Sequence, residues 1–333
     1  MIQKTRLSTL HSMNVKTALR VGVTATLITL VFTQVDFSAL PGALGALDPV
    51  HAVTALAILL CVRMLMAARM VMVAREFDVT LSYTDSVAMV FSSSLAGFVL
   101  PGGVGTDVVR GLQLSSMYND PQFAAASVIV DRFLGVLSIL IVGAFALQFV
   151  ELPFPWFFDA FVYLCLAGGI GVVLFGQTLC ERVPVSLREP ASENQTSTPL
   201  RLLAKALGFV EQVLAALQHS KNMFGLMSIS LAIQVCRCLV FLFTFYAFNL
   251  AVPIATVFAL VPVLFIIVIA PISVGGLGVR ESLLALLLVP QGYPLESLIL
   301  VGFASHLLEL IASLPGAIFL LRGFKPQNGN AQT

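Results

Sequence analysis

The sequence predicts an all-α polytopic membrane protein with six full spans and two Pro/Gly-broken re-entrant hairpins, arranged as an inverted repeat. Of the 333 residues, 58% are hydrophobic and 11% are charged, against about 25% charged residues in a typical soluble domain. The apolar residues stand in long runs, and two of these runs are interrupted by similar motifs rich in proline and glycine. Too few polar side chains are present to cover a soluble surface, so lipid is the expected solvent.

Charge balance and cysteine spacing exclude several classes of function. The net charge of +1 offers no basic surface for nucleic acid. The five cysteines match no CxxC or zinc spacing and indicate no disulfide framework, and we expect neither a metal nor a cofactor. No GxxxxGK[ST] motif occurs, so we expect no ATP coupling within the chain.

Six apolar segments are long enough, or nearly so, to cross a bilayer, which takes about 20 residues. They are 19–35, 49–72, 122–150, 155–180, 223–250 and 296–321. Two further stretches, 86–117 and 252–290, are broken midway by PGGVG (101–105) and PISVGGLG (271–278). Each limb is too short or too interrupted for one clean span, which favours hairpins that enter and leave on the same side.

The placement of Lys and Arg sets the expected orientation, because short cytoplasmic loops are enriched in cations. The N-terminal tail, the 181–222 loop and the C-terminal tail carry cations, whereas loops 36–48 and 290–295 carry none. Both termini are therefore expected in the cytoplasm. These loop assignments are consistent with one another only if the first hairpin enters from the cytoplasm and the second enters from outside. We expect a single integral membrane domain over residues 1–333, with repeat one at about 19–150 and repeat two at about 155–321.

The two hairpin motifs support the repeat independently. Pro101 precedes Arg110 by nine positions, as Pro271 precedes Arg280, and the two motifs lie 170 residues apart. Non-helical backbone at membrane depth needs a protein interior or a wet cavity to satisfy its polar groups. We therefore expect a central polar cavity between the repeats. The glycines that would let the backbone approach a ligand there are Gly102, Gly103, Gly105, Gly275, Gly276 and Gly278. The alternative is that proline and glycine only kink two buried helices.

Charged residues beside the motifs are the candidate binding groups. A guanidinium fits phosphate, so Arg110 and Arg280 are expected to hold an anionic headgroup. Asp107 and Glu281 would orient these arginines or exchange a proton. The alternative pairs each arginine with its neighbouring carboxylate as a structural lock. Asp131 is expected at the cavity as well.

Other charges in the spans have expected roles that are mainly structural. Arg132 and Arg69 are expected as cations that reach the interface. Arg63 and Arg237, near the middle of two spans, either hold helices together or contact substrate. For His306 and Glu309 we expect a hydrogen-bonded structural pair.

The 181–222 segment is expected to be a cytoplasmic linker followed by an amphipathic helix. Leucines and valines recur at three- and four-residue steps from Leu200 to Leu217. This spacing is typical of a helix with one apolar face lying on the membrane interface. A dimer seam is the alternative.

Three segments resemble a known family: FVLPGGVGTDVVRGLQL (98–114), DRFLG (131–135) and APISVGGLGVRESLLALLL (270–288). They are similar to the flippase-like lysylphosphatidylglycerol synthase transmembrane family, and the likeness covers about residues 15 to 321. Thr106 departs from the family, which often has a glycine there. The resemblance implies a bacterial or archaeal cytoplasmic membrane. It places the family motif on Pro101, Gly102, Gly103, Gly105, Asp107, Arg110, Asp131, Arg132, Pro271, Gly275, Gly276, Gly278, Arg280 and Glu281.

The leading hypothesis is an inner-membrane lipid translocator that moves an anionic or amphipathic (phospho)lipid between leaflets. The sequence lacks the soluble aminoacyltransferase domain of the full synthases, so we expect a transporter and not an enzyme. A membrane enzyme acting on a lipid-linked substrate, with Asp107, Asp131 or Glu281 as acid or base, is one alternative. An envelope-biogenesis scaffold is another. The expected partner is a membrane lipid, with a second copy or envelope-biosynthesis proteins as further candidates and no nucleic acid.

Overall fold

The computed structural model describes residues 45, 47–99, 105–150, 156–181, 198–218, 222–269 and 277–322. Every regular element in these ranges is a helix. The predicted first span, 19–35, and most of both hairpin motifs lie outside the described residues. The helices are α3 (Pro49–Arg75), α4 (Tyr83–Val99), α5 (Gly105–Tyr118), α6 (Pro121–Ala146), α7 (Trp156–Glu181), α9 (Thr198–Gln218), α10 (Met223–Ala247), α11 (Ile254–Ile269), α12 (Val279–Leu288), the 3-10 turn η1 (Val289–Gln291), α13 (Leu295–Ser313) and α14 (Gly316–Arg322).

Five described helices are long and apolar enough to cross a membrane: α3, α6, α10, α13 and the segment Asp159–Gly176 of α7. Each coincides with one of the predicted spans. Their apolar side chains point in all directions, as expected for helices whose surroundings are protein on one side and lipid on the other. The chain is a multi-pass, all-helical membrane protein.

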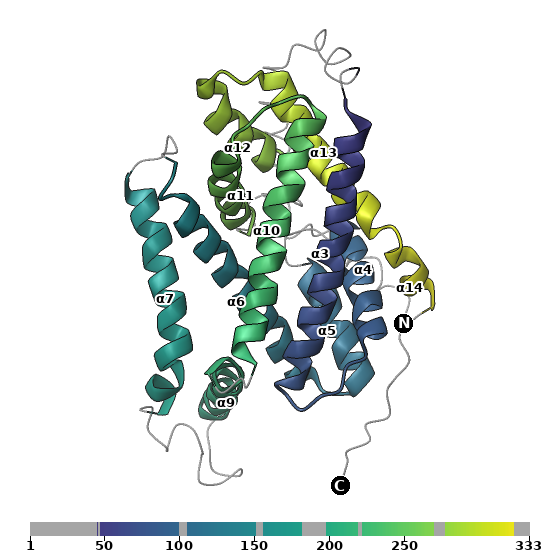
Figure 1. Ribbon diagram of the computed structural model, residues 1–333. Helices are drawn as coiled ribbons and strands as arrows, with labels where there is room; N and C mark the ends of the chain where they lie inside the picture. The colour runs from purple at the N-terminus through teal and green to yellow at the C-terminus, as the bar shows by residue number, and fades with distance from the viewer. Residues whose placement is uncertain are drawn as a thin grey trace, which may run out of the picture.

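The long helices α3 and α10 lie side by side and run antiparallel through the centre of the molecule (Figure 1). Asp48 caps α3, since its side chain accepts a hydrogen bond from the Val50 N–H at 2.8 Å. The Asp48 N–H in turn donates to the Ala247 carbonyl at 2.8 Å. The first turn of α3 is therefore held beside the last turn of α10.

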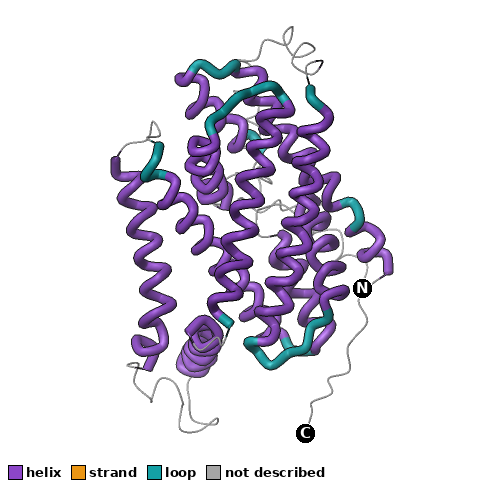
Figure 2. The backbone as a smooth tube through the Cα atoms, in the orientation of Figure 1, coloured by secondary structure: helices purple, strands orange, loops and turns teal. Residues whose placement is uncertain are grey.

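Two pairs of shorter helices flank this central pair at opposite ends. Helices α4 and α5 lie in the lower half of Figure 1, and α11 and α12 lie in the upper half. The loops that lead into them, 76–82 and 248–253, are at opposite ends of the tube in Figure 2. Within the first pair, Thr106 of α5 contacts Gly97 of α4, where a Cβ atom would lie 3.3 Å from the Thr106 Cβ. Gly278 precedes α12 with φ = 79°, a conformation that suits glycine.

The last predicted span, 296–321, is two helices in the structure. Helix α13 ends at Ser313, and α14 begins at Gly316. Pro315 cannot donate a hydrogen bond to the preceding turn, which explains the break. Gly316 lies against the backbone of Phe91, where a Cβ atom would come within 2.6 Å of the Phe91 carbonyl carbon. The bend therefore brings α14 onto α4.

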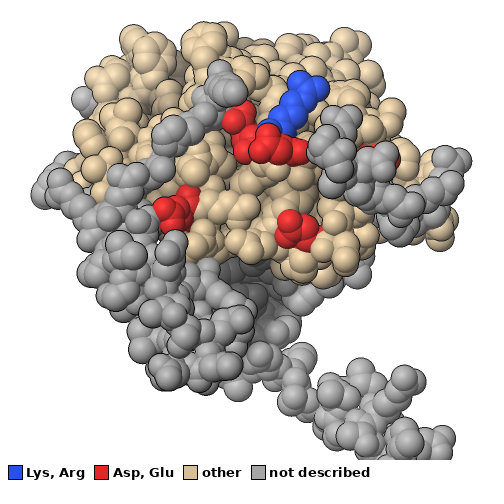
Figure 3. Space-filling view, turned by 90° about the horizontal axis from the view of Figure 1, so that it is seen from below, with Lys and Arg blue, Asp and Glu red and all other residues tan. Residues whose placement is uncertain are grey.

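The predicted amphipathic helix is present as α9. Ala216 and Leu217 of this helix are buried against Val130 and Leu134 of α6 and against Leu226 of α10. Seen from below, the described surface at this end is mostly uncharged, with acidic and basic side chains confined to small areas (Figure 3). The location of α9 at a membrane interface stays a prediction.

Candidate functional site

A cavity of about 260 Å³ is lined by the central helix pair, the two flanking pairs, α6 and Glu309 of α13. Its lining includes six arginines and three carboxylates, an excess of three positive charges. An arginine or aspartate at the centre of a membrane helix costs about 2.5–3.5 kcal/mol on insertion scales, so nine such groups around one cavity are unlike a purely structural core. They are Arg63, Arg69, Asp107, Arg110, Asp131, Arg132, Arg237, Arg280 and Glu309.

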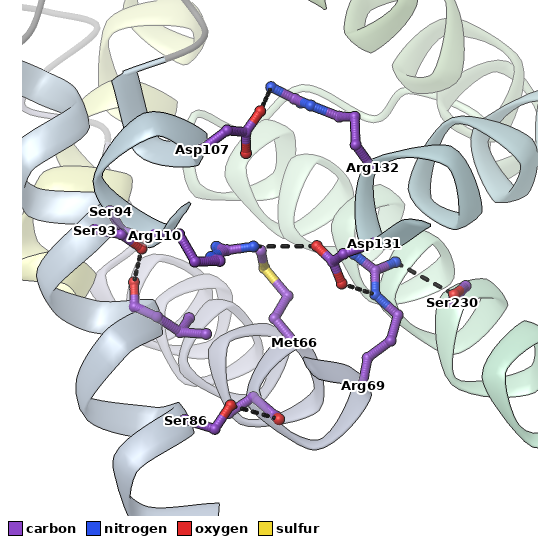
Figure 4. Close-up of polar contacts among 12 residues, drawn as sticks. Met66, Arg69, Ser86, Ser93, Ser94, Asp107, Arg110, Asp131, Arg132 and Ser230 are labelled. Atoms are coloured by element: carbon purple, nitrogen blue, oxygen red, sulfur yellow. Dashed lines mark hydrogen bonds and ion pairs between the residues drawn. The ribbon is translucent and has the colours of Figure 1, made fainter. Parts of the chain in front are cut away.

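One carboxylate, Asp131 of α6, joins two arginines from other helices. Arg69 of α3 donates from Nε to its Oδ1 at 2.7 Å, and Arg110 of α5 donates from Nη1 to its Oδ2 at 3.1 Å (Figure 4). Arg69 also donates to the Ser230 hydroxyl of α10 at 3.2 Å. All three charged side chains are at most 7% exposed. Arg69 is therefore not the interfacial cation that the sequence predicts, because its position on α3 faces α6 and not the membrane surface.

Asp107, in the first turn of α5, pairs with Arg132 of α6 at 2.5 Å (Figure 4). The predicted partner, Arg110, turns instead to Asp131. Adjacent residues on a helix point in different directions, so Asp131 reaches α3 while Arg132 reaches the start of α5. The Arg132 side chain is thus paired with Asp107 while 44% exposed, and its extension to the cytoplasmic interface stays a prediction.

The second half of the chain supplies a related cluster around Arg280 of α12. Arg280 contacts Glu309 of α13 at 3.1 Å and donates to the Ser305 hydroxyl at 3.2 Å. Its guanidinium carbon lies 5.9 Å from the centre of the Phe265 ring. The sequence predicts a pair between His306 and Glu309, but Glu309 turns to Arg280 because the two side chains face each other across the α12–α13 contact.

Glu281 is fully buried and lies outside the cavity lining. Its Oε2 accepts a hydrogen bond from the Gly278 N–H at 2.8 Å, which caps the first turn of α12. Its Oε1 is 3.6 Å from Nε2 of His306. In this structure Glu281 holds the start of α12 and does not orient Arg280 at the cavity; the other role predicted for it, proton exchange, stays a prediction.

Arg63 of α3 and Arg237 of α10 line the cavity without a carboxylate at ion-pair distance among the described residues. Arg63 donates from Nη1 to the Ser94 hydroxyl at 2.7 Å. Arg237 lies 3.9 Å from the Met66 sulfur, and its guanidinium carbon is 5.0 Å from the centre of the Phe265 ring. These are neutral contacts, so both charges stay uncompensated by a direct partner.

The structure thus brings together four of the predicted site residues: Asp107, Arg110, Asp131 and Arg280. Two predicted glycines, Gly105 and Gly278, are buried at the starts of α5 and α12 but do not line the cavity. The remaining ones, Pro101, Gly102, Gly103, Pro271, Gly275 and Gly276, lie outside the described residues.

For five lining residues the sequence either predicts no role in the binding site or leaves a structural role and a binding role open. They are Arg63, Arg69, Arg132, Arg237 and Glu309. The sequence signal that marks these residues is the free-energy cost of placing a charged side chain in the membrane, because each lies within or at the edge of an apolar segment. The sequence does not show which face of each helix meets the cavity.

Comparison with known families supports the resemblance drawn from the motifs. The family model described as lysylphosphatidylglycerol synthase TM region matches residues 17–316, which is 300 of the 333 residues. No curated protein and no solved structure matches the chain.

Proposed function

We propose that this chain, which belongs to the lysylphosphatidylglycerol synthase transmembrane family, moves an anionic or amphipathic lipid between the leaflets of the cytoplasmic membrane. The observation that carries the proposal is the arginine-rich cavity enclosed by helices long enough to span a bilayer. A polar cavity at membrane depth gives a lipid headgroup a path that the hydrocarbon core denies it. The acyl chains would remain in the bilayer while the headgroup passes.

The order of the helices supports an inverted repeat around this cavity. Helix α10 begins 174 residues after α3 (223 against 49), and α13 begins 174 residues after α6 (295 against 121). The same offset relates Arg63 to Arg237 and Asp131 to Ser305. Arg110 and Arg280 are related by the 170-residue offset of the two motifs. The contact of Arg110 with Asp131 in the first half therefore has a counterpart in the contact of Arg280 with Ser305 in the second.

The lengths of the flanking helices support re-entrant hairpins. Helices α4, α5, α11 and α12 have 17, 14, 16 and 10 residues, fewer than the roughly 20 that a span needs. Their leading loops lie at opposite ends of the molecule (Figure 2). Two hairpins that enter from opposite sides and end near the centre would close the cavity alternately toward each leaflet.

Leaflet exchange in liposomes tests the proposal. Purified protein is reconstituted with fluorescent anionic and isoprenoid lipids, and a quencher that cannot cross the bilayer reports how much label reaches the outer leaflet. We expect exchange above that of empty liposomes, and its loss in Arg110→Ala/Arg280→Ala. Arg75→Ala is the matched control, because Arg75 is exposed at the end of α3 and outside the cavity.

Two results would contradict lipid translocation. The first is wild-type exchange equal to that of empty liposomes with every lipid tried. The second is chemical conversion of a lipid-linked substrate without exchange, which would favour the alternative of a membrane enzyme.

A further inference from the structure

Arg63 and Arg237 lie near the middle of α3 and α10, two helices long and apolar enough to cross a membrane. The hydrogen bond between Asp48 and Ala247 fixes a common reference at one end of the α3–α10 pair. Arg63 is 14 residues from Pro49 along α3, about 21 Å, and Arg237 is ten residues from Ala247 along α10, about 15 Å. The hydrocarbon core is about 30 Å thick. Because α3 has 27 residues and α10 has 25, both arginines lie near the middle of a span, and we therefore place them near the bilayer midplane.

These two arginines differ from the other four that line the cavity. Arg69, Arg110, Arg132 and Arg280 each contact a carboxylate within 3.1 Å. Arg63 and Arg237 contact only a hydroxyl, a thioether and an aromatic ring. The buried Nε of Arg63 makes no hydrogen bond, a feature that it shares with the Nε atoms of Arg110 and Arg280. An arginine is always charged in proteins. Glu309 acts on both arginines from beyond ion-pair distance, but it is already paired with Arg280, so neither arginine has a carboxylate of its own in the described lining.

The count of charges indicates how much negative charge the anion carries. The Arg69–Asp131–Arg110 cluster retains one positive charge, the Asp107–Arg132 and Arg280–Glu309 pairs are balanced, and Arg63 and Arg237 add two. A phosphodiester headgroup with one negative charge would leave two of the three positive charges uncompensated. A phosphomonoester carries about −1.5 to −2 at pH 7, and a diphosphate carries more.

We propose that Arg63 and Arg237 form the midplane binding site for a phosphate group with more than one negative charge, the phosphomonoester or diphosphate of a lipid headgroup. This inference rests on the proposed lipid translocation. Each guanidinium offers a planar fork of N–H donors that matches phosphate oxygens. The cavity, at about 260 Å³, is close to the lower end of small-molecule sites, about 300 Å³, and so suits a headgroup and not a whole lipid.

A binding titration tests the assignment. The probes are phosphatidic acid and phosphatidylglycerol with identical acyl chains, and soluble inorganic pyrophosphate, each added to the purified full chain in detergent micelles. We expect phosphatidic acid to bind more tightly than phosphatidylglycerol. Arg63→Gln and Arg237→Gln are each expected to weaken the binding of phosphatidic acid by about tenfold or more, because each removes charge-assisted hydrogen bonds. Arg75→Gln, on the same helix as Arg63 but outside the cavity, is expected to bind as the wild type does.

Thermal unfolding without any probe separates a binding role from a structural one. Neither substitution removes a carboxylate's partner, so both variants are expected to unfold at the wild-type temperature or above it. Arg69→Gln, which removes one of the two partners of buried Asp131, is the comparison that is expected to unfold earlier.

Four results would overturn the inference. One is phosphatidylglycerol binding as tightly as phosphatidic acid, and another is binding of pyrophosphate alone, which would mean a free anion instead of a lipid headgroup. The third is wild-type affinity in both glutamine variants, and the fourth is a loss of thermal stability in them as large as in Arg69→Gln. If affinity is unchanged in the variants while leaflet exchange continues, the proposed function stands without this site. Tight binding without exchange would instead contradict the proposed function.

Discussion

Arg69 of α3 and Asp131 of α6 form a 2.7 Å ion pair that is almost fully withdrawn from solvent and joins residues 62 positions apart in the sequence. Asp131 also accepts from Arg110 of α5. One carboxylate therefore ties three helices together on one side of the cavity. Removing a member of a buried ion pair is costly, because the charge that remains has lost its partner and has no water to replace it.

Asp131→Asn is expected to destabilise the protein strongly. The substitution leaves Arg69 and Arg110 buried without a carboxylate, at a cost of about 3–5 kcal/mol in the free energy of unfolding. Asp107→Asn is the matched control, because it breaks the more exposed pair with Arg132, which is worth about 0–1 kcal/mol. Equilibrium unfolding in mixed micelles measures both. Equal losses in the two variants would mean that Asp131 does not hold the helices together.

The sequence predicts the helices of this protein better than it predicts the partners of its charges. Hydropathy is a local property, so the five described spans follow from composition alone. The pairing of Arg69 with Asp131 depends on how α3 and α6 are rotated about their axes, and the sequence of a single segment does not determine this rotation. Spacing within one helix predicts that Asp107 pairs with Arg110 and that His306 pairs with Glu309. In the structure, three of these four side chains form their ion pairs across helix contacts, and His306 faces Glu281 of α12.

Gly97→Ala is expected to destabilise the α4–α5 pair, and Thr106→Ala is expected to relieve the effect. A Cβ atom at position 97 would overlap the Thr106 hydroxyl oxygen and lie 3.3 Å from the Thr106 Cβ. Overpacking of this kind costs about 1–3 kcal/mol. Without the hydroxyl group, the remaining contact is tight but tolerable, so the penalty should fall by more than half.

A double-mutant cycle of unfolding free energies measures this coupling between positions 97 and 106. Gly168→Ala in α7 is the control, because a Cβ atom there would meet nothing within 4 Å and alanine favours a helix. Penalties that simply add in the double variant would contradict the contact.

The cap of α3 predicts a pH-dependent difference between the wild type and Asp48→Asn. The hydrogen bond from the Val50 N–H and the nearby His51 hold the pKa of Asp48 below its ordinary value of 3.8. A carboxyl group whose pKa is lowered by folding stabilises the folded state above its ordinary pKa, and this contribution is lost as the pH falls through the lowered value. Asparagine keeps the capping oxygen but has no charge.

We therefore expect the wild type to melt above Asp48→Asn at pH 6 and the two melting temperatures to converge as the pH is lowered below about 4. Because the Asp48 side chain is partly exposed to solvent, added salt should also reduce the difference. A gap that stays constant over this pH range would show that the charge of Asp48 does not stabilise the helix.

Cysteines at positions 80 and 251 are expected to face opposite sides of the membrane. Thr80 follows the end of α3, and Ala251 follows the end of α10, which the bond between Asp48 and Ala247 holds beside the start of α3. The 27 residues of α3 extend about 40 Å, more than the hydrocarbon core of about 30 Å. Both positions are exposed, so a maleimide that cannot cross the membrane should reach each from one side only.

Arg75, at the end of α3, indicates which of the two positions faces the cytoplasm. Arg75 lies at the end that leads to Thr80, and the enrichment of cations in cytoplasmic loops places that end inside. In a chain without its native cysteines, Ala251→Cys should be labelled in intact cells and Thr80→Cys only after permeabilisation. The reverse pattern would invert the proposed orientation but keep the two hairpins opposed. Labelling of both from one side would contradict α3 as a span, and with it the hairpins that enter from opposite faces toward the arginines of the cavity.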